Sequence, residues 1–532
     1  MATARPRVTR RSPRRRSSSA TLAGLALALA ACSDSAPPVP APATREITTV
    51  PTTVAPAPTT VAPGEPAPTT TAAPEPLEYT IDWEQLGGRV EAGMLSVPLD
   101  YADPQGDTIE LYVTRHRAKE SGRIGALLVN NGGPGSPASS MGIDAPSWFA
   151  SPITDRFDVV AWDPRGTGVS GGSVDCIDDD EYDRFYSAID ITPEDDAERE
   201  ELVELAEEFA ERCVARVGEP LQYIGTNNSA RDMDAIRQAL GEEQVSYFGF
   251  SYGSELGGVW ATLFPLTVRA AVFDGAADPE ADSLEQTRQQ WMGFESALNT
   301  FLDACSDDSS CRFHNDGDAA SAFDDLLVRL DDEPLPGPGE RVDVNLGVAV
   351  TGVVRAMYSD QFWPVLERAL EDAAEGDGTG LLQLQDAYFQ RSADGTYSNL
   401  LEAFQAISCA DDRERPTVEE SDEQAAELLT VAPRLFPYTT GSYSCTFFPP
   451  ALDPRIEITG VGAGPIVVIG TTGDPSTPLS SSRNMAAALE DGRLVIVEAN
   501  QHTGYGVNSC IDDVVHDYLV QLAAPPTETV CS

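Results

Sequence analysis

The sequence predicts an α/β fold in which helices cover both faces of a mostly parallel central sheet. Short apolar runs rich in β-branched residues recur along the chain, and each is bounded by Gly, Asp or Asn. Helical patterns separate these runs, and near-continuous apolar strands between helices are typical of a parallel sheet buried on both sides. The expected strands are residues 125–130, 157–162, 245–250, 268–275, 464–470 and 493–499.

The order of these patterns divides the folded part into segments. Residues 89–101 and 107–118 have the pattern of two paired strands joined by a turn, and they open a first core segment over residues 78–280. Helical patterns over about residues 176–240 predict an insertion within it. Between residues 281 and 455 the strand pattern stops and helical patterns follow one another, which predicts a large helical cap. Residues 456–532 then return to the core pattern.

The first 77 residues have the features of an export signal and a spacer. Seven arginines without an acid precede a short apolar run, as in a secretory signal peptide over residues 1–31. The run ends in Leu-Ala-Ala-Cys, which resembles the lipobox of bacterial lipoproteins and marks Cys32 for lipidation. Residues 32–77 are rich in Pro, Thr, Ala and Val, so we expect an extended tether without a core. The expected location is the outer face of the cytoplasmic membrane or the cell envelope, with the lipid anchor as the only membrane contact.

The charge balance narrows the possible partners. The formal net charge is −50 and Lys119 is the only lysine, so nucleic acid and anionic lipid are poor partners. The acidity suits either amine-bearing substrates or a solvated acidic surface. No CxxC or HxxxH spacing occurs, so we expect neither a metal site nor a cofactor.

Eight cysteines remain after Cys32, and an even number in an exported protein predicts disulfides. The sequence alone allows 105 connectivities. The connectivity with the shortest loops is Cys176–Cys213, Cys305–Cys311, Cys409–Cys445 and Cys510–Cys531.

Candidate catalytic residues follow three of the expected strands. Ser251 lies in a Gly-x-Ser-x-Gly corner after 245–250, Asp474 follows 464–470, and His502 follows 493–499. A serine hydroxyl becomes a nucleophile when an imidazole removes its proton, and a carboxylate must orient that imidazole. The chain order Ser, Asp, His is that of the α/β-hydrolases. Backbone N–H groups must also bind the oxyanion, and Tyr252 and Gly133 are the expected donors.

Five motifs together resemble one family: "NNGGPGSP", "DPRGTGVS", "GFSYGSELG", "GTTGDPSTP" and "NQHTGYG". They are similar to the secreted actinobacterial tripeptidyl aminopeptidases, within the prolyl-aminopeptidase-like α/β-hydrolases, over roughly residues 85–532. The layout is also similar to that of mycobacterial cell-envelope lipoprotein serine proteases. The resemblance implies Ser251 as nucleophile, Asp474 as orienting acid and His502 as base. Asn131 departs from the pattern, because prolyl aminopeptidases usually have His there.

Other residues are candidates for substrate binding and loop support. A free N-terminus needs a carboxylate near the acyl pocket, and the candidates are Glu255, Asp278, Asp411 and Asp412. Each is also an ordinary helix or turn residue. Asp163 and Arg165 are expected to brace the loop beside the serine corner. Thr477 either buttresses the Asp474 loop or caps the helix that follows.

The leading interpretation is an extracellular serine exopeptidase that cleaves peptides or proteins near a free N-terminus through an acyl-enzyme. A carboxylesterase or lipase could use the same triad, and so could an endoprotease with few targets. A ligand-binding lipoprotein without catalysis is the alternative of a different class, but it would not need the three triad residues in order.

Overall fold

The computed structural model describes residues 77–532 apart from 340, 437 and 439–441, so the expected signal peptide, Cys32 and nearly all of the tether lie outside the described residues. One ten-stranded sheet has the order β1-β2-β3-β5-β4-β6-β7-β8-β9-β10. The neighbours β1, β2, β3 and β5 pair antiparallel with one another. From β5 through β4 and β6 to β10, all neighbouring strands pair parallel. The strands are β1 (Glu84–Gly87), β2 (Val90–Pro98), β3 (Thr108–His116), β4 (Gly125–Asn130), β5 (Phe157–Trp162), β6 (Val245–Phe250), β7 (Val268–Asp274), β8 (Ile466–Thr471), β9 (Gly492–Val497) and β10 (Glu528–Cys531).

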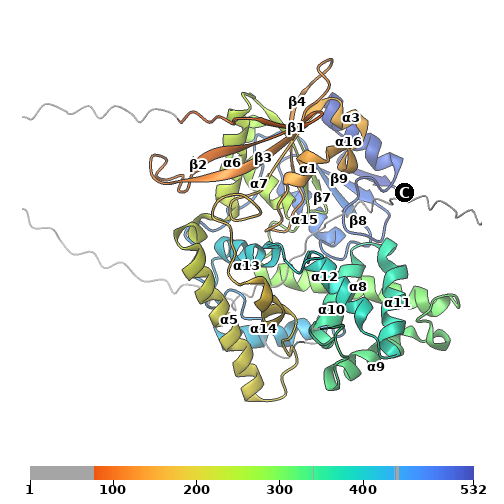
Figure 1. Ribbon diagram of the computed structural model, residues 1–532. Coiled ribbons are helices and arrows are strands. Elements are labelled where there is room, and N and C mark those ends of the chain that lie inside the picture. Colours follow the sequence, from red (N-terminus) through yellow and green to blue (C-terminus); the bar gives the residue numbers. More distant parts are fainter. Residues whose placement is uncertain (1–76, 340, 437, 439–441) are drawn as a thin grey trace, which may run out of the picture.

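Helices cover both faces of this sheet and form a second layer below it in Figure 1. Those of the sheet layer are α1 (Ser139–Ile143), α2 (Ala145–Trp148), α3 (Ser151–Thr154), α6 (Thr226–Ala239), α7 (Gly253–Leu263), α15 (Leu479–Ala488) and α16 (Ser509–Gln521). Those of the lower layer are α5 (Asp196–Val217), α8 (Ser283–Asp307), α9 (Ala319–Asp332), α10 (Leu346–Met357), α11 (Trp363–Ala374), α12 (Thr379–Tyr388), α13 (Leu400–Asp411) and α14 (Val418–Val431). The short helix α4 (Tyr182–Tyr186) precedes α5.

Three groups of buried apolar side chains hold these layers together. One packs on the sheet face covered by α1, α2, α3 and α16. The second lies on the opposite face, under α6 and α7, and extends to α5 and α13. The third is built almost entirely from α8 to α12 and α14, so the lower layer has a core of its own. The sheet layer and the helical layer therefore each have their own core, and a cavity between the layers is bounded by one layer on each side.

The region expected as one helical insertion over about 176–240 is divided between the two layers. Helix α5 lies in the lower layer, whereas α6 packs against α7 and β2 in the sheet layer (Figure 1). The difference has a physical reason. Most side chains of α6 are buried, as a helix covering a sheet requires, whereas α5 buries only Phe209, Ala210 and Cys213.

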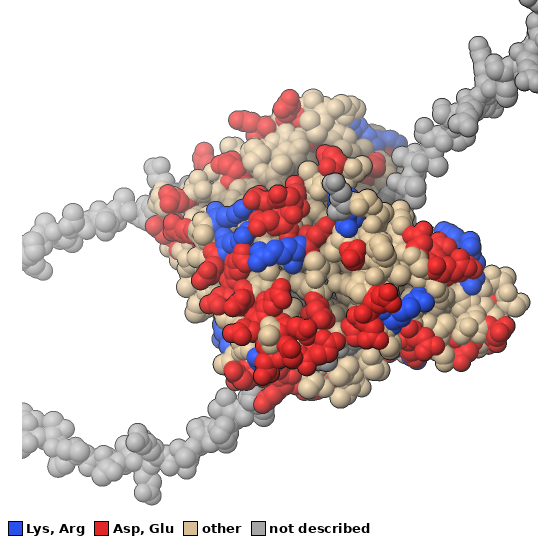
Figure 2. Space-filling view, turned by 60° about the horizontal axis from the view of Figure 1, so that its bottom comes forward, with Lys and Arg blue, Asp and Glu red and all other residues tan. Residues whose placement is uncertain are grey.

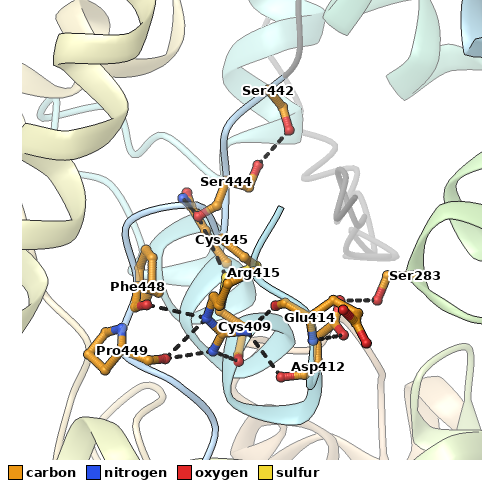
Figure 3. Close-up of a disulfide and its surroundings, with 11 residues drawn as sticks. Ser283, Cys409, Asp412, Glu414, Arg415, Ser442, Ser444, Cys445, Phe448 and Pro449 are labelled. Carbon is orange, nitrogen blue, oxygen red and sulfur yellow. Dashed lines mark hydrogen bonds between the residues drawn. A yellow bond between two sulfur atoms is a disulfide. The ribbon is translucent and has the colours of Figure 1, made fainter. Parts of the chain in front are cut away.

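Four disulfides join the eight described cysteines in the shortest-loop pairs expected from the sequence: Cys176–Cys213, Cys305–Cys311, Cys409–Cys445 and Cys510–Cys531. In Figure 3 the Arg415 guanidinium lies beside the Cys409–Cys445 disulfide. It donates to the backbone oxygens of Cys409 and Pro449, at 2.5 and 2.6 Å. These contacts tie the end of α13 to the chain near residue 449.

Acidic side chains cover much of the helical layer's surface, as Figure 2 shows for the face that includes the lower part of Figure 1. In the described part of the chain, no helix combines the length and apolar character needed to cross a membrane.

Candidate active site

Ser251 lies at a sharp corner between β6 and α7. Its φ of 56° is in the left-handed region, which a residue other than glycine rarely adopts. The flanking glycines make this corner possible, because a Cβ at Gly249 would lie 2.3 Å from the carbonyl oxygen of Gly253. The backbone N–H of Ser251 donates to the Asp274 carbonyl oxygen at 2.8 Å. The corner therefore holds the serine side chain in one place at the end of the sheet.

Asp474 and His502 form a buried pair beside this corner. The two Asp474 carboxylate oxygens lie 2.8 and 2.9 Å from Nδ1 of His502, and neither side chain is exposed to solvent. Asp474 also accepts from the backbone N–H groups of Ser476 and Thr477, at 3.0 and 2.8 Å. A carboxylate held in this way fixes the orientation of the imidazole.

The other ring nitrogen of His502 is available for a serine proton. Nε2 is buried and has no hydrogen-bond partner among the described residues, so no bond joins it to Ser251 Oγ in this structure. The ring nevertheless lies close to the end of β7, since a Cβ at Gly275 would be 2.9 Å from His502 Cε1. Catalytic hydrogen bonds of this kind are often long before substrate binds.

Thr477 supports the Asp474 loop from within. Its hydroxyl donates to the Gly275 carbonyl oxygen at 2.9 Å and lies 3.2 Å from Asp474 Oδ2 and 3.3 Å from His502 Nδ1. The alternative role as a helix cap is wrong, because Pro478 is the N-cap of α15 and no side chain caps that helix. The position agrees with the expected buttress.

The glycine loop after β4 lies against the serine corner. Gly133, Ser251 and Tyr252 line the same cavity, as expected for oxyanion donors. The closest approach is at Gly132, which the sequence did not single out: a Cβ there would lie 2.7 Å from the Phe250 carbonyl oxygen and 2.9 Å from Ser251 Cβ. Only glycine fits this position.

Asp163 and Arg165 lie outside that cavity and bond to neighbouring chain segments. Asp163 accepts from the backbone N–H groups of Ser139 and Val169, at 2.9 and 3.1 Å. Arg165 is fully buried and forms a two-pronged ion pair with Asp232 of α6, with N–O distances of 2.6 and 2.7 Å. It also donates to the Leu99 carbonyl oxygen at 2.9 Å. Asp163 thus holds the start of α1, and Arg165 holds the chain after β2 to α6; a bracing role at the serine corner stays a prediction.

The cavity at Ser251 has a volume of about 360 Å³ and an acidic lining. Six acidic and two basic residues line it, including all four sequence candidates, Glu255, Asp278, Asp411 and Asp412. The structure therefore brings these four carboxylates to the cavity that holds the serine.

The four carboxylates differ in how they are already bonded. Asp278 accepts from the side-chain amides of Gln289 and Asn484, at 3.0 and 2.7 Å, and so braces two helices. Asp412 accepts from the Ser283 hydroxyl. These two carboxylates therefore already accept from neighbouring side chains, as Asp411 does from Thr226.

Glu255 and Asp411 lie close enough to interact, since the Glu255 carboxylate contributes to the raised pKa of Asp411. Glu255 Oε1 lies 3.2 Å from Gln286 Nε2 and 3.4 Å from Arg455 Nε, and no hydrogen bond to its Oε2 is present within the described residues. Asp411 accepts from the N–H and hydroxyl of Thr226, at 2.7 and 2.5 Å. Burial raises the pKa of Asp411 to about 7, against the effect of these hydrogen bonds and of Arg455.

Asp274, at the end of β7, is a carboxylate beside the site that was not among the candidates from the sequence. Asp274 is fully buried and accepts from the N–H groups of Gly504 and Tyr505, at 2.7 and 2.8 Å, which fixes the loop after His502. Burial raises its pKa to about 7. The signal that could have found it is its place as the last residue of an expected strand, four residues before Asp278.

The fold and the position of the site at the ends of the strands indicate the class of protein. Residues 125–509 match the model of the alpha/beta hydrolase fold family, which is most of the chain, and the protein belongs to that family. It is thus an enzyme of the α/β-hydrolase class, and the fold predicted from the sequence is confirmed.

Three named proteins have sequences similar to that of this chain. The chain is 33% identical to "Serine protease Hip1" of Mycobacterium tuberculosis strain H37Rv, over 84% of this chain and 88% of that protein. It is 35% identical to "Carboxylesterase B" of the same organism, over 82% and 85%. It is 29% identical to "Tripeptidyl aminopeptidase" of Streptomyces coelicolor, over 85% and 86%. The resemblance to tripeptidyl aminopeptidases and mycobacterial serine proteases that the motifs predicted is confirmed.

Proposed function

We propose that the protein is an exported, lipid-anchored serine exopeptidase that cleaves peptides near a free N-terminus. The observation that carries this proposal is the acidic cavity at Ser251, in which Glu255 and Asp411 lie near one guanidinium, that of Arg455. Because the pKa of Asp411 is raised to about 7, this end of the cavity carries one net negative charge when Asp411 is ionised, and a substrate ammonium would stabilise that ionised form. The relatives named serine protease and tripeptidyl aminopeptidase support peptide bonds as the target.

In the proposed cycle, Ser251 Oγ attacks the scissile carbonyl while His502 Nε2 accepts its proton. Asp474 stabilises the imidazolium, and the N–H groups of Tyr252 and Gly133 bind the oxyanion. His502 then donates the proton to the leaving amine, and an acyl-enzyme on Ser251 forms. Water, deprotonated by His502, hydrolyses this ester and regenerates the serine. Glu255 and Asp411 hold the ammonium of the acyl segment throughout.

A carboxylesterase is the second candidate, because the triad does not choose between amide and ester and one relative at 35% identity is named Carboxylesterase B. An endoprotease is a variant of the first. The acidic lining favours the exopeptidase over both, since neither a neutral ester nor an internal peptide segment brings an N-terminal ammonium to the cavity.

The test uses the purified full chain and three reporters: a free-amine tripeptide anilide, its N-acetylated twin and a nitrophenyl ester. We expect cleavage of the free-amine peptide alone, lost in Ser251→Ala and retained in Ser296→Ala, which changes an exposed serine of α8. Equal cleavage of the acetylated peptide would show an endoprotease. Ester turnover alone would show an esterase. Turnover that survives Ser251→Ala would remove the triad from the mechanism, and no turnover of any reporter would favour a binding protein.

A further inference from the structure

A second cavity lies inside the helical layer, and we call it the cap chamber. Its volume is about 250 Å³, and side chains of α4, α5, α8, α10, α12 and α13 line it together with Tyr443 and its neighbours. Most of the lining is aromatic or aliphatic. Its main apolar members are Phe209, Trp291, Phe294, Val354, Phe389 and Phe404.

The cap chamber adjoins the cavity at Ser251. Gln290 and Phe404 line both spaces and so form the wall between them. Gln290 donates to the Ser476 hydroxyl at 3.2 Å, and the Ser476 N–H donates to Asp474. On the other side, a Cβ at Gly135 would lie 2.6 Å from the backbone N of Phe404, so α13 touches the glycine loop. The shared wall therefore lies between the Asp474 loop and the glycine loop.

The chamber has the size and chemistry of a pocket for an apolar side chain. An apolar cavity of about 150 Å³ is large enough to bind benzene, so 250 Å³ holds an aromatic side chain. Two buried polar groups of the lining have no hydrogen-bond partner among the described residues: the Tyr186 hydroxyl and the indole N–H of Trp291, which is 7% exposed. That N–H can donate to a backbone carbonyl of a bound chain.

Helix α13 sets the distance between the chamber and the proposed ammonium site. Phe404 and Asp411 are seven residues apart, which is two helical turns, so they lie on one face of α13 about 10 Å apart. An extended peptide covers that distance in about three residues. A peptide whose ammonium lies at Asp411 therefore brings its second or third side chain to the chamber.

We propose that the cap chamber binds a bulky apolar side chain on the second or third residue of the substrate's N-terminal segment. This proposal rests on the proposed exopeptidase function, because the ammonium site sets which residue reaches the chamber. Binding in the cap chamber makes the enzyme selective for N-terminal segments that combine a free amine with an aromatic or branched aliphatic side chain.

The experiment fills the chamber with a larger side chain and compares the kcat/KM values of several substrates. Ala206 of α5 lines the chamber, and Ala206→Phe places a benzyl group there. The matched control is Ala215→Phe, the same change at an exposed position of the same helix. Leu202→Trp fills the chamber from another position, in case Ala206→Phe does not fold. The substrates are free-amine tripeptide anilides with Phe in place of Ala at the first, second or third position. Nitrophenyl acetate and nitrophenyl octanoate form a second series.

We expect Phe at the second or third position to raise kcat/KM about tenfold or more in the unchanged protein and in Ala215→Phe. Ala206→Phe and Leu202→Trp should lose that gain and retain turnover of the all-Ala peptide. Equal selectivity in the filled and control variants would overturn the proposal. A preference for octanoate that filling removes, without peptide turnover, would also overturn it, because the occupant would then be an ester acyl chain. Peptide turnover without a free-amine requirement would refute the exopeptidase function, whereas turnover with that requirement and unchanged selectivity would refute only the chamber.

Discussion

The two walls of the substrate space differ in how they are built. On the sheet side, polar groups sit at strand ends and are buried in hydrogen bonds: Asp474 accepts from His502 and from two backbone N–H groups, and Asp274 accepts from two more. On the cap side, helices distant in sequence enclose a mostly apolar chamber. The difference suggests that the sheet supplies the chemistry and the cap supplies the choice of substrate. Changes on the sheet side should then affect kcat, and changes on the cap side should affect selectivity.

The largest effect is expected from Asp474→Asn. The amide cannot hold His502 in the tautomer that accepts the serine proton, so kcat should fall about 10⁴-fold with little change in KM. Steady-state kinetics on the free-amine peptide measure this. Asp491→Asn, which alters an exposed residue paired with Arg493, is the control and should retain full activity. A loss of less than tenfold in Asp474→Asn would mean that the sheet side does not supply the chemistry.

The Cys409–Cys445 disulfide should matter more for the cap than for the sheet. It ties α13, which forms the shared wall, to the chain beside Tyr443 of the chamber (Figure 3). Replacing both cysteines with serine should lower the free energy of unfolding by about 2–4 kcal/mol and weaken the preference for Phe-containing peptides. The matched double variant at Cys510 and Cys531 should leave that preference unchanged. Denaturant unfolding and kcat/KM ratios measure the two effects, and equal selectivity in both double variants would contradict the division of roles.

Asp274 should make stability depend on pH. Its pKa is about 7 in the folded protein and near 3.8 in the unfolded chain, so the folded state binds the proton more tightly. Stability from this group is present at low pH and is lost as the pH rises towards 7, by about 2–3 kcal/mol between pH 5 and pH 8. Burial raises the pKa of Asp411 to about 7 and that of Glu402 to about 8. These two groups therefore also lower the free energy of unfolding as the pH rises. Asp274→Asn should therefore show a shallower fall than the unchanged protein in denaturant unfolding at several pH values. A parallel fall in both would show that Asp274 does not titrate in this range.

The smallest effect is expected from Glu255→Gln. Removal of the negative charge weakens a hydrogen bond to the substrate ammonium, so KM for the free-amine peptide should rise about 10- to 30-fold. The acetylated peptide should show no such change. Glu280→Gln at an exposed position is the control. If both peptides lose the same activity, Glu255 supports the fold of the cavity and does not bind the ammonium.

The sequence predicted the sheet better than the helical layer. Strands β4, β5 and β6 coincide with the expected runs because each is a continuous buried run, whose signal is local. The short edge strands β1 and β10 were missed, because four partly exposed residues leave no such pattern. Between residues 281 and 455 the sequence predicted only a succession of helical patterns, and the structure divides it into α8 to α14.

The same contrast holds for the site. Ser251, Asp474 and His502 could be found because each follows a strand whose end lies at one edge of the sheet. The close approach of Gly132 and the loop contacts of Asp274 depend on distances between chain segments, which no local pattern contains. The cap chamber is lined by six helices that are distant in sequence, so its position beside the nucleophile could not be predicted from spacing.

The most direct test of the central claim is labelling of the full chain with a fluorophosphonate, followed by peptide mapping. We expect one adduct, on Ser251, and no adduct in Asp474→Asn over the same short time. We also expect a free-amine tripeptide to slow the labelling and its acetylated twin to leave it unchanged. An adduct on another serine, or equal protection by both peptides, would contradict the assignment of Ser251 and the ammonium site.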